Sequence, residues 1–212
     1  MTTLVNETNL DNWTISPPQK NNHGAFYWSI NTTNSKLHPR VQICDTQDPM
    51  RIPFGPTSFD PNGRKSLDFS VHDPNVQKFL RDVDTWVVDY VWKNVSTFFK
   101  KPPVSREALL DNYTPIISQR NDFEPLLKGK VNDSCLVFVV NDGTSKKGDI
   151  LDIQPGTSGV PVIQFDKIWV MNGNKFGVTV VTQALLMHPK KEKDLNEIFR
   201  GAFIDLAGNY AS

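Results

Sequence analysis

Residues 163–183, IQFDKIWVMNGNKFGVTVVTQ, form two apolar runs on either side of the polar turn Asn172-Gly173-Asn174. Such a turn between β-branched runs predicts a β-hairpin. Side chains alternate along an extended strand. One face of the first strand is therefore expected to carry Ile163, Phe165, Lys167, Trp169 and Met171. A plain core would not need lysines among these rings, so this hairpin is the first candidate for a functional surface.

Two interpretations of the mixture of rings and lysines stay open. Exposed rings can stack on nucleic-acid bases, at ~1–3 kcal/mol per base, while lysines contact phosphates. A barrel strand that turns its rings inward and leaves its lysines at the rim would have the same composition. The pattern within the hairpin favours neither interpretation.

The clearest helical pattern begins at Asp73, which can cap a helix, and Pro74, which suits the first helical position. Apolar residues then recur at spacings of three and four, and Pro102-Pro103 ends the pattern. We expect one long amphipathic helix over about residues 74–100 that covers a core. A second, short helix is expected from Ser105.

Short β-rich runs separated by turn residues make up most of the remaining chain. Residues 25–33 and 40–45 suit a strand pair, residues 66–71 a short strand, and about five short strands follow residue 112. This pattern predicts a small barrel or sandwich. The expected organisation is a flexible polar arm over residues 1–24, one domain over 25–190, and a C-terminal helix and tail over 191–212.

Charge and composition exclude several classes of protein. The formal net charge is +0, from 23 basic and 23 acidic residues, so nucleic-acid binding would need local segregation of charge. Cys44 and Cys135 have no metal-site spacing, and reduced thiols are expected. The start lacks a secretory pattern, and no apolar run reaches the ~18 residues of a membrane span. We expect an intracellular, soluble protein without membrane association.

Catalytic signals are weak throughout the sequence. The histidines are His23, His38, His72 and His188, and they are scattered along the chain. None of the common hydrolase, metalloprotease, phosphate-loop or dinucleotide motifs occurs. We therefore expect a protein that is not an enzyme, with no catalytic residue, no metal site and no cofactor.

Two blocks between residues 112 and 187 carry a resemblance to a known family. The first block contains Tyr113, Pro115, Pro125, Leu126, Leu127, Lys128 and Lys130. The second contains Trp169, Gly173, Lys175, Phe176, Gly177 and Gln183. Together they resemble the single-stranded-DNA-binding replication proteins of large DNA viruses, a family similar to a phage protein with an oligonucleotide/oligosaccharide-binding (OB) barrel.

The resemblance implies a β-rich α+β fold, namely an OB-like, closed or partly open β-barrel with the long helix inserted. It implies a protein that coats single-stranded DNA without sequence preference during viral replication, recombination or repair. The implied location is the cytoplasm or nucleus of an infected cell, or the virion. The residues implied at phosphates are Lys128, Lys130, Lys167 and Lys175, and those implied at bases are Trp169 and Phe176. Trp28, with its neighbours Phe26 and Tyr27, is expected to extend the stacking surface.

The C-terminal sequence departs from this family. Its relatives usually end in an acidic tail that recruits partner enzymes, but in FRGAFIDLAGNYAS the only acid is Asp205. Recruitment of replication proteins or other viral proteins is therefore expected to use Phe199, Phe203 and Leu206. Assembly into a homo-oligomer is a further expectation.

The alternative function is a virion structural or capsid-associated interaction protein, built on a β-barrel and without nucleic-acid binding. The zero net charge, the polar arm over residues 1–24 and the missing acidic end motivate it.

Overall fold

The computed structural model describes residues 2–21, 25–58, 65–119, 121–141, 143–171 and 175–188. The strands are β1 (Thr3–Leu4), β2 (Trp13–Ile15), β3 (Gln19–Lys20), β4 (Phe26–Thr32), β5 (Arg40–Gln42), β6 (Met50–Ile52), β7 (Thr57–Ser58), β8 (Lys65–Ser70), β9 (Tyr113–Thr114), β10 (Ile117–Ser118), β11 (Leu126–Asn141), β12 (Thr144–Lys147), β13 (Thr157–Val170) and β14 (Phe176–His188). The helices are α1 (Pro74–Lys93), α2 (Val95–Phe98) and α3 (Arg106–Leu110), with short 3-10 turns η1 (Val5–Glu7), η2 (Leu10–Asn12) and η3 (Ile150–Asp152).

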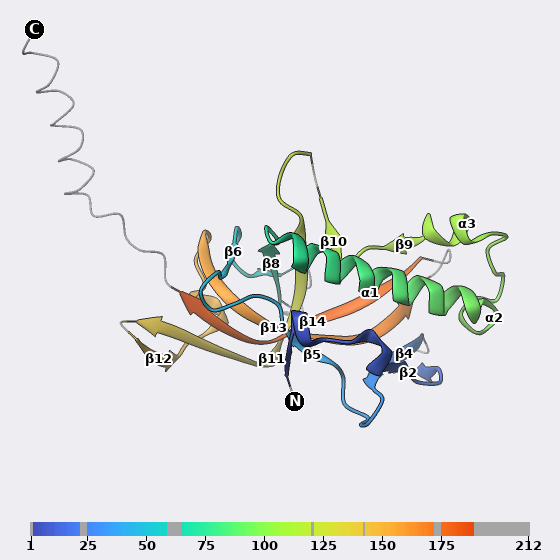
Figure 1. Cartoon of the computed structure of the whole chain (residues 1–212), viewed down its shortest axis with the longest axis horizontal. Helices are drawn as coiled ribbons and strands as arrows, with labels where there is room; N and C mark the ends of the chain where they lie inside the picture. Colours follow the sequence, from blue (N-terminus) through green and yellow to red (C-terminus); the bar gives the residue numbers. More distant parts are fainter. Residues whose placement is uncertain are drawn as a thin grey trace, which may run out of the picture.

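The strands form one large curved sheet with α1 packed across it (Figure 1). The main path runs β1-β5-β13-β14-β11-β8-β7, and β4 adds to it by pairing with β13. The β-rich fold with one long helix is confirmed. Among the described strands the path does not close on itself, so the expectation of a closed barrel is not confirmed.

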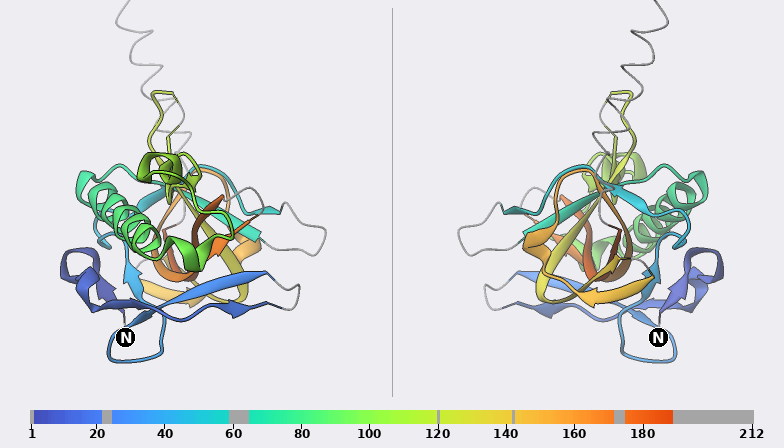
Figure 2. Two further views of the ribbon diagram at one scale, coloured as in Figure 1. Left: turned by 90° about the vertical axis from the view of Figure 1, so that its right-hand side faces the viewer. Right: turned by 90° about the vertical axis from the view of Figure 1, so that its left-hand side faces the viewer.

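The hairpin of β13 and β14 is the centre of the sheet (Figure 2). Both strands are much longer than the short strands that the sequence predicts. β13 begins before residue 163 and β14 continues beyond residue 183. Two register shifts interrupt their antiparallel pairing, one at Gln183 in β14 and one at Asp166 in β13. Each is a β-bulge, in which an extra residue on one strand changes which face the following side chains occupy.

Helix α1 begins as predicted. The carboxylate of Asp73 accepts a hydrogen bond from the backbone N–H of Asn75 at 2.8 Å, and Pro74 occupies the first turn. The predicted end near residue 100 is wrong, because α1 ends at Lys93 and the backbone leaves helical geometry at Asn94 before α2. Helix α3 is capped by Ser105, as expected.

The apolar side of α1 packs on one face of the sheet and builds the core. The buried residues that α1 contributes are Val76, Phe79, Leu80, Val83, Val87, Val88 and Val91. Phe79 meets Phe165 of β13 with ring centroids 6.0 Å apart. The sequence-predicted role of this helix, covering a core, is confirmed.

The segment before β4 is not a free arm, so the interpretation of residues 1–24 is wrong for the part that the structure describes. β1 pairs with β5, while β2 and β3 pair with β4. Trp13 is 7% exposed and packs between Phe79, Trp86 and Phe165. The energy of burying this indole holds the segment on the sheet.

β8 confirms the strand over residues 66–71. The pairing of residues 25–33 with 40–45 is wrong, because β4 and β5 each pair with a different part of β13. The helix and tail expected over residues 191–212 lie outside the described residues. No helix in the described ranges has both the length and the apolar character to cross a membrane.

Candidate functional site

At the bulge at Asp166, the alternation of β13 side chains between the two faces of the sheet shifts by one residue. Before it, Ile163 and Phe165 are buried in the core. After it, Ile168 takes the core position, while Lys167 and Trp169 lie on the opposite side and are only partly covered. The prediction that all of these alternate residues share one face is therefore wrong, because the extra residue shifts the alternation by one position.

The face opposite the core, called the open face below, continues across the neighbouring strands. Residues paired with Lys167, Trp169 and Gln164 identify it. On β4 these are Ser29 and Tyr27, on β5 Arg40, and on β14 Thr179, Gly177 and Val181. Lys130 of β11 pairs with Val181, and Lys128 lies two residues before Lys130 on the same side. Val181 is buried yet lies outside the core cluster, as expected for a small side chain beneath longer neighbours.

Basic side chains gather on the open face. They are Arg40, Arg51, Lys128, Lys130, Lys147 and Lys167, placed by their register with β13, β14, β8 and β11. Asp68, opposite Lys128, and the bulged Asp166 contribute negative charge. Other acids, such as Asp45, Asp48 and Asp82, are exposed in a loop or on α1. A chain of zero net charge thus carries a locally basic surface.

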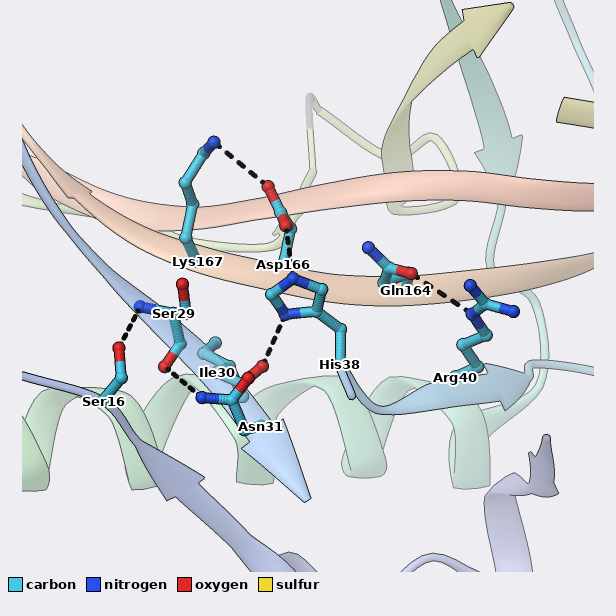
Figure 3. Close-up of polar contacts among 9 residues, drawn as sticks. All are labelled: Ser16, Ser29, Ile30, Asn31, His38, Arg40, Gln164, Asp166 and Lys167. Carbon is cyan, nitrogen blue, oxygen red and sulfur yellow. Dashed lines mark hydrogen bonds and ion pairs between the residues drawn. The ribbon is translucent and has the colours of Figure 1, made fainter. Parts of the chain in front are cut away.

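The carboxylate of Asp166 organises the centre of this face (Figure 3). Lys167 Nζ lies 3.3 Å from Asp166 Oδ2, and His38 Nε2 lies 3.3 Å from Asp166 Oδ1. His38 Nδ1 is 2.7 Å from the carbonyl oxygen of Ile30. Beside them, Arg40 Nε donates to Gln164 Oε1 at 3.2 Å. These contacts orient two cations along neighbouring strands.

Trp169 and Tyr27 face each other across β13 and β4. The indole of Trp169 lies over Gly177, where an added Cβ would approach its Cζ2 to 2.8 Å. Glycine at this position therefore lets the ring lie close to the β14 backbone. Lys167 Nζ sits 4.9 Å from the ring centre of Tyr27, a cation–π contact. One end of the open face thus combines two rings with a cation.

Two predicted stacking residues are in the core instead. Trp28 is 3% exposed and stacks on Phe98 with centroids 4.1 Å apart. Phe176 is 0% exposed and packs against Phe99 and Tyr113. Both rings are enclosed by α2, the residue after it and β9, so the prediction that they contact bases is corrected. Phe26 is exposed, and the side chain of Lys20 lies over its ring.

The predicted lysines lie at the surface. Lys128 and Lys130 are exposed on β11, on either side of Gly129. A Cβ at Gly129 would clash with the buried Oγ1 of Thr182, so only glycine fits at this core-facing position. The lysines on either side of Gly129 point to the opposite face. Lys175 is exposed at the end of the hairpin, just before β14. The predicted partner residues Phe199, Phe203 and Leu206 lie outside the described residues.

The structure adds Arg40, Arg51, Gln164 and Lys147 to the residues that the sequence singled out. These residues lie far apart in the sequence, and the strand pairing with β13 or β11 places them on the open face. In the run AFYWSINTT, Trp28 and Ile30 are two residues apart and both apolar, which predicts that they face the core. The same alternation predicts that Tyr27 lies on the opposite face.

Among the residues that the structure describes, no group of three potential metal ligands occurs. Cys44 and Cys135 are free thiols, and burial raises the pKa of each to about 11. Such thiols hold their protons at neutral pH and are poor nucleophiles.

No protein-family model and no curated protein sequence matches this chain. Among solved structures, a single-stranded DNA-binding protein from bacteriophage Enc34, in complex with ssDNA, is similar over 85% of this chain and 98% of its own. The two sequences are 12% identical, and the TM-score is 0.45. A likeness at this level says nothing about what the present chain binds.

Proposed function

We propose that this chain is a non-enzymatic protein that binds single-stranded DNA on the open face, without sequence preference. The supporting observation is the local gathering of basic side chains beside the ring pair of Trp169 and Tyr27, on the side of the sheet turned away from α1. Cations that follow a backbone and rings that accept any base are the two components of non-specific single-strand binding.

In this proposal Lys128, Lys130, Lys167 and Arg40 contact phosphates, and Trp169 stacks on a base. Lys167 covers the ring of Tyr27 in the unbound chain. A phosphate that attracts this ammonium also uncovers the ring, so that one movement supplies a cation and a second stacking surface. Lys175 is exposed near this end and meets the strand where it leaves the sheet.

The finer parts of the proposal rest on the resemblance of residues 112–187. It supports an OB-like, partly open arrangement and a role in viral DNA replication or recombination. The proposed preference for DNA over RNA rests on the same resemblance. The partly open order of the strands is compatible with the OB-like arrangement.

Fluorescence titration of a labelled oligo-dT at two ionic strengths tests the proposal. Binding should weaken steeply with salt, because each phosphate neutralised on a single strand releases about 0.7 counterions. An unlabelled oligo-U competitor measures the choice of DNA over RNA. Salt-independent binding, or no binding at micromolar protein, would contradict the proposal. Stoichiometric association with a coat protein without any oligonucleotide affinity would instead support the virion alternative.

Replacing Asp166 by asparagine should tighten oligo-dT binding by several-fold at low salt. The change removes a negative charge 3.3 Å from Lys167 Nζ and keeps an oxygen that His38 can approach. Asp82→Asn on α1 is the matched control, because it removes the same charge far from the open face and should leave affinity almost unchanged. Equal effects of the two variants would show that only net charge matters.

A further inference from the structure

The open face ends, beyond its lysines, in a second cluster of a ring and a cation. On the outer half of β11, Phe138 is 38% exposed and Leu136 is 52% exposed. β12 returns antiparallel along one side of this half of β11, while β14 pairs with its other side (Figure 1). Leu136 and Phe138 are two residues apart on one strand, so they share a face and form a small exposed apolar patch there.

Register places Phe138 on the open face and not on the core side. Its chain neighbours Val137 and Val139 pack on the core. Phe138 pairs with Leu186 of β14, whose own neighbours Leu185 and Met187 are core residues. Phe138 therefore points to the same side of the sheet as Lys130 and Lys167.

The cation of this cluster is Lys147, which pairs directly with Phe138 across β11 and β12. Lys146, one residue earlier, pairs with Val139 and so belongs to the opposite face. The pairing of Phe138 with Lys147 repeats, at the far end of the open face, the combination of Trp169 with Lys167.

We propose that Phe138 and Lys147 form a second contact site for the same single strand, with the ring stacking on a base and the ammonium meeting a phosphate. This inference rests on the proposed function. Single-stranded nucleic acid is the chosen occupant because the cluster is continuous with the basic face and itself carries a cation, which suits a polyanion.

The separation of the two ends sets the length of strand that can reach both. Trp169 pairs with Gly177 and Phe138 with Leu186, so the ends are 186 − 177 = 9 residues apart along β14. At about 3.3 Å per strand residue this is roughly 30 Å. A stacked strand, at about 3.4 Å per nucleotide, covers it with about nine nucleotides. That length lies within the roughly 4–16 nucleotides that single OB folds occupy.

Oligo-dT of about five and about twelve nucleotides, titrated against the full chain, tests this second site. A twelve-nucleotide strand reaches both ends, whereas a five-nucleotide strand reaches one. Phe138→Ala should weaken binding of the longer strand about 5- to 150-fold, the range that stacking of one base implies, and change the shorter one little. Lys147→Ala should weaken the longer strand and lower its salt dependence, while Lys146→Ala should do neither.

Two further measurements separate the possible outcomes. Phe138→Leu keeps an apolar side chain without a ring, so its binding should remain weak, whereas Phe138→Trp should bind like the unchanged chain. If leucine restores binding, or if Phe138→Ala weakens both lengths equally, the stacking site is refuted. If Phe138→Ala changes self-association in sedimentation and leaves oligonucleotide affinity alone, the cluster is a contact between copies. Failure of the unchanged chain to bind either length refutes the proposed function itself.

Discussion

Replacing Lys128, Lys130 and Lys167 together by alanine should weaken oligo-dT binding about 500-fold in about 0.05 M salt. Each phosphate contact on a single strand contributes about 0.7 to the slope of log affinity against log salt. At about 0.05 M salt, one contact therefore raises the affinity about eightfold relative to about 1 M salt. The slope itself should fall by about 2. Lys128 and Lys130 extend from β11 and Lys167 from β13, so the change removes cations from both sides of β14.

A matched triple variant, Lys78→Ala, Lys93→Ala and Lys100→Ala, controls for the change in total charge. These lysines are exposed on α1 or just beyond α2, on the core-covering side of the molecule. The control variant should keep its affinity within a few-fold and its salt slope unchanged. Equal losses in the two triple variants would mean that binding follows net charge, and the open face would no longer be the interface. Thermal unfolding of both variants checks that neither has lost its fold.

The second large effect concerns stability and arises at Asp84 of α1. This carboxylate accepts hydrogen bonds from Tyr113 Oη at 2.5 Å and from the backbone N–H of Ile116 at 3.1 Å. Burial nevertheless raises the pKa of Asp84 to about 6, above the ordinary value of 3.8, because desolvation of the charge outweighs the two hydrogen bonds that lower it. The same burial, with the nearby carboxylate, raises the pKa of Tyr113 well above 10.

A carboxyl group with a raised pKa makes the folded state less stable as pH rises. Between about pH 3.8 and pH 6 the folded chain holds this proton and the unfolded chain releases it. The contribution of Asp84 to the free energy of unfolding should therefore be greatest below pH 3.8 and should fall by about 3 kcal/mol by pH 7. Urea unfolding at a series of pH values measures this fall.

Asp84→Asn isolates the contribution of this one group. The amide oxygen can accept from both Tyr113 and Ile116, and the side chain carries no charge at any of these pH values. The variant should match the unchanged chain near pH 4 and exceed its stability at pH 7 by up to about 3 kcal/mol. If the difference between the two proteins is the same at pH 4 and pH 7, the carboxyl does not titrate in this window. Asp82→Asn, at an exposed position of the same helix, keeps Asp84 and should therefore lose stability between pH 4 and pH 7 as the unchanged chain does.

Local sequence patterns predicted several elements correctly, and each of them depends on neighbours in the chain. The cap at Asp73, the apolar repeat of α1 and the cap at Ser105 each involve residues within a few positions of one another. The hairpin of β13 and β14 likewise follows from β-branched runs around a short polar turn. Spacing of 3.6 or 2 residues and turn chemistry are properties that a single stretch of sequence carries.

The proposed binding face is only partly predictable from the sequence. Lys128, Lys130, Lys167 and Trp169 were identified, and the structure brings them to one face of the sheet. Their neighbours there could not be identified, because Arg40 lies more than a hundred residues before Gln164 and meets it only when β5 pairs with β13. Trp13 shows the same limit. Its polar, Asn-rich surroundings resemble a free arm, whereas its burial depends on rings from α1 and β13.

The sequence alone predicts a β-rich chain with one core-covering helix and a hairpin that carries both rings and lysines. Which of those side chains are accessible depends on how the elements pack. The extra residue at Asp166 sends Phe165 to the core and Lys167 and Trp169 to the other side. Phe98 of α2 covers Trp28, and Phe99 and Tyr113 cover Phe176. The physical reason is that alternation along a strand defines two faces, but a bulge and the elements packed on each face determine which one meets water.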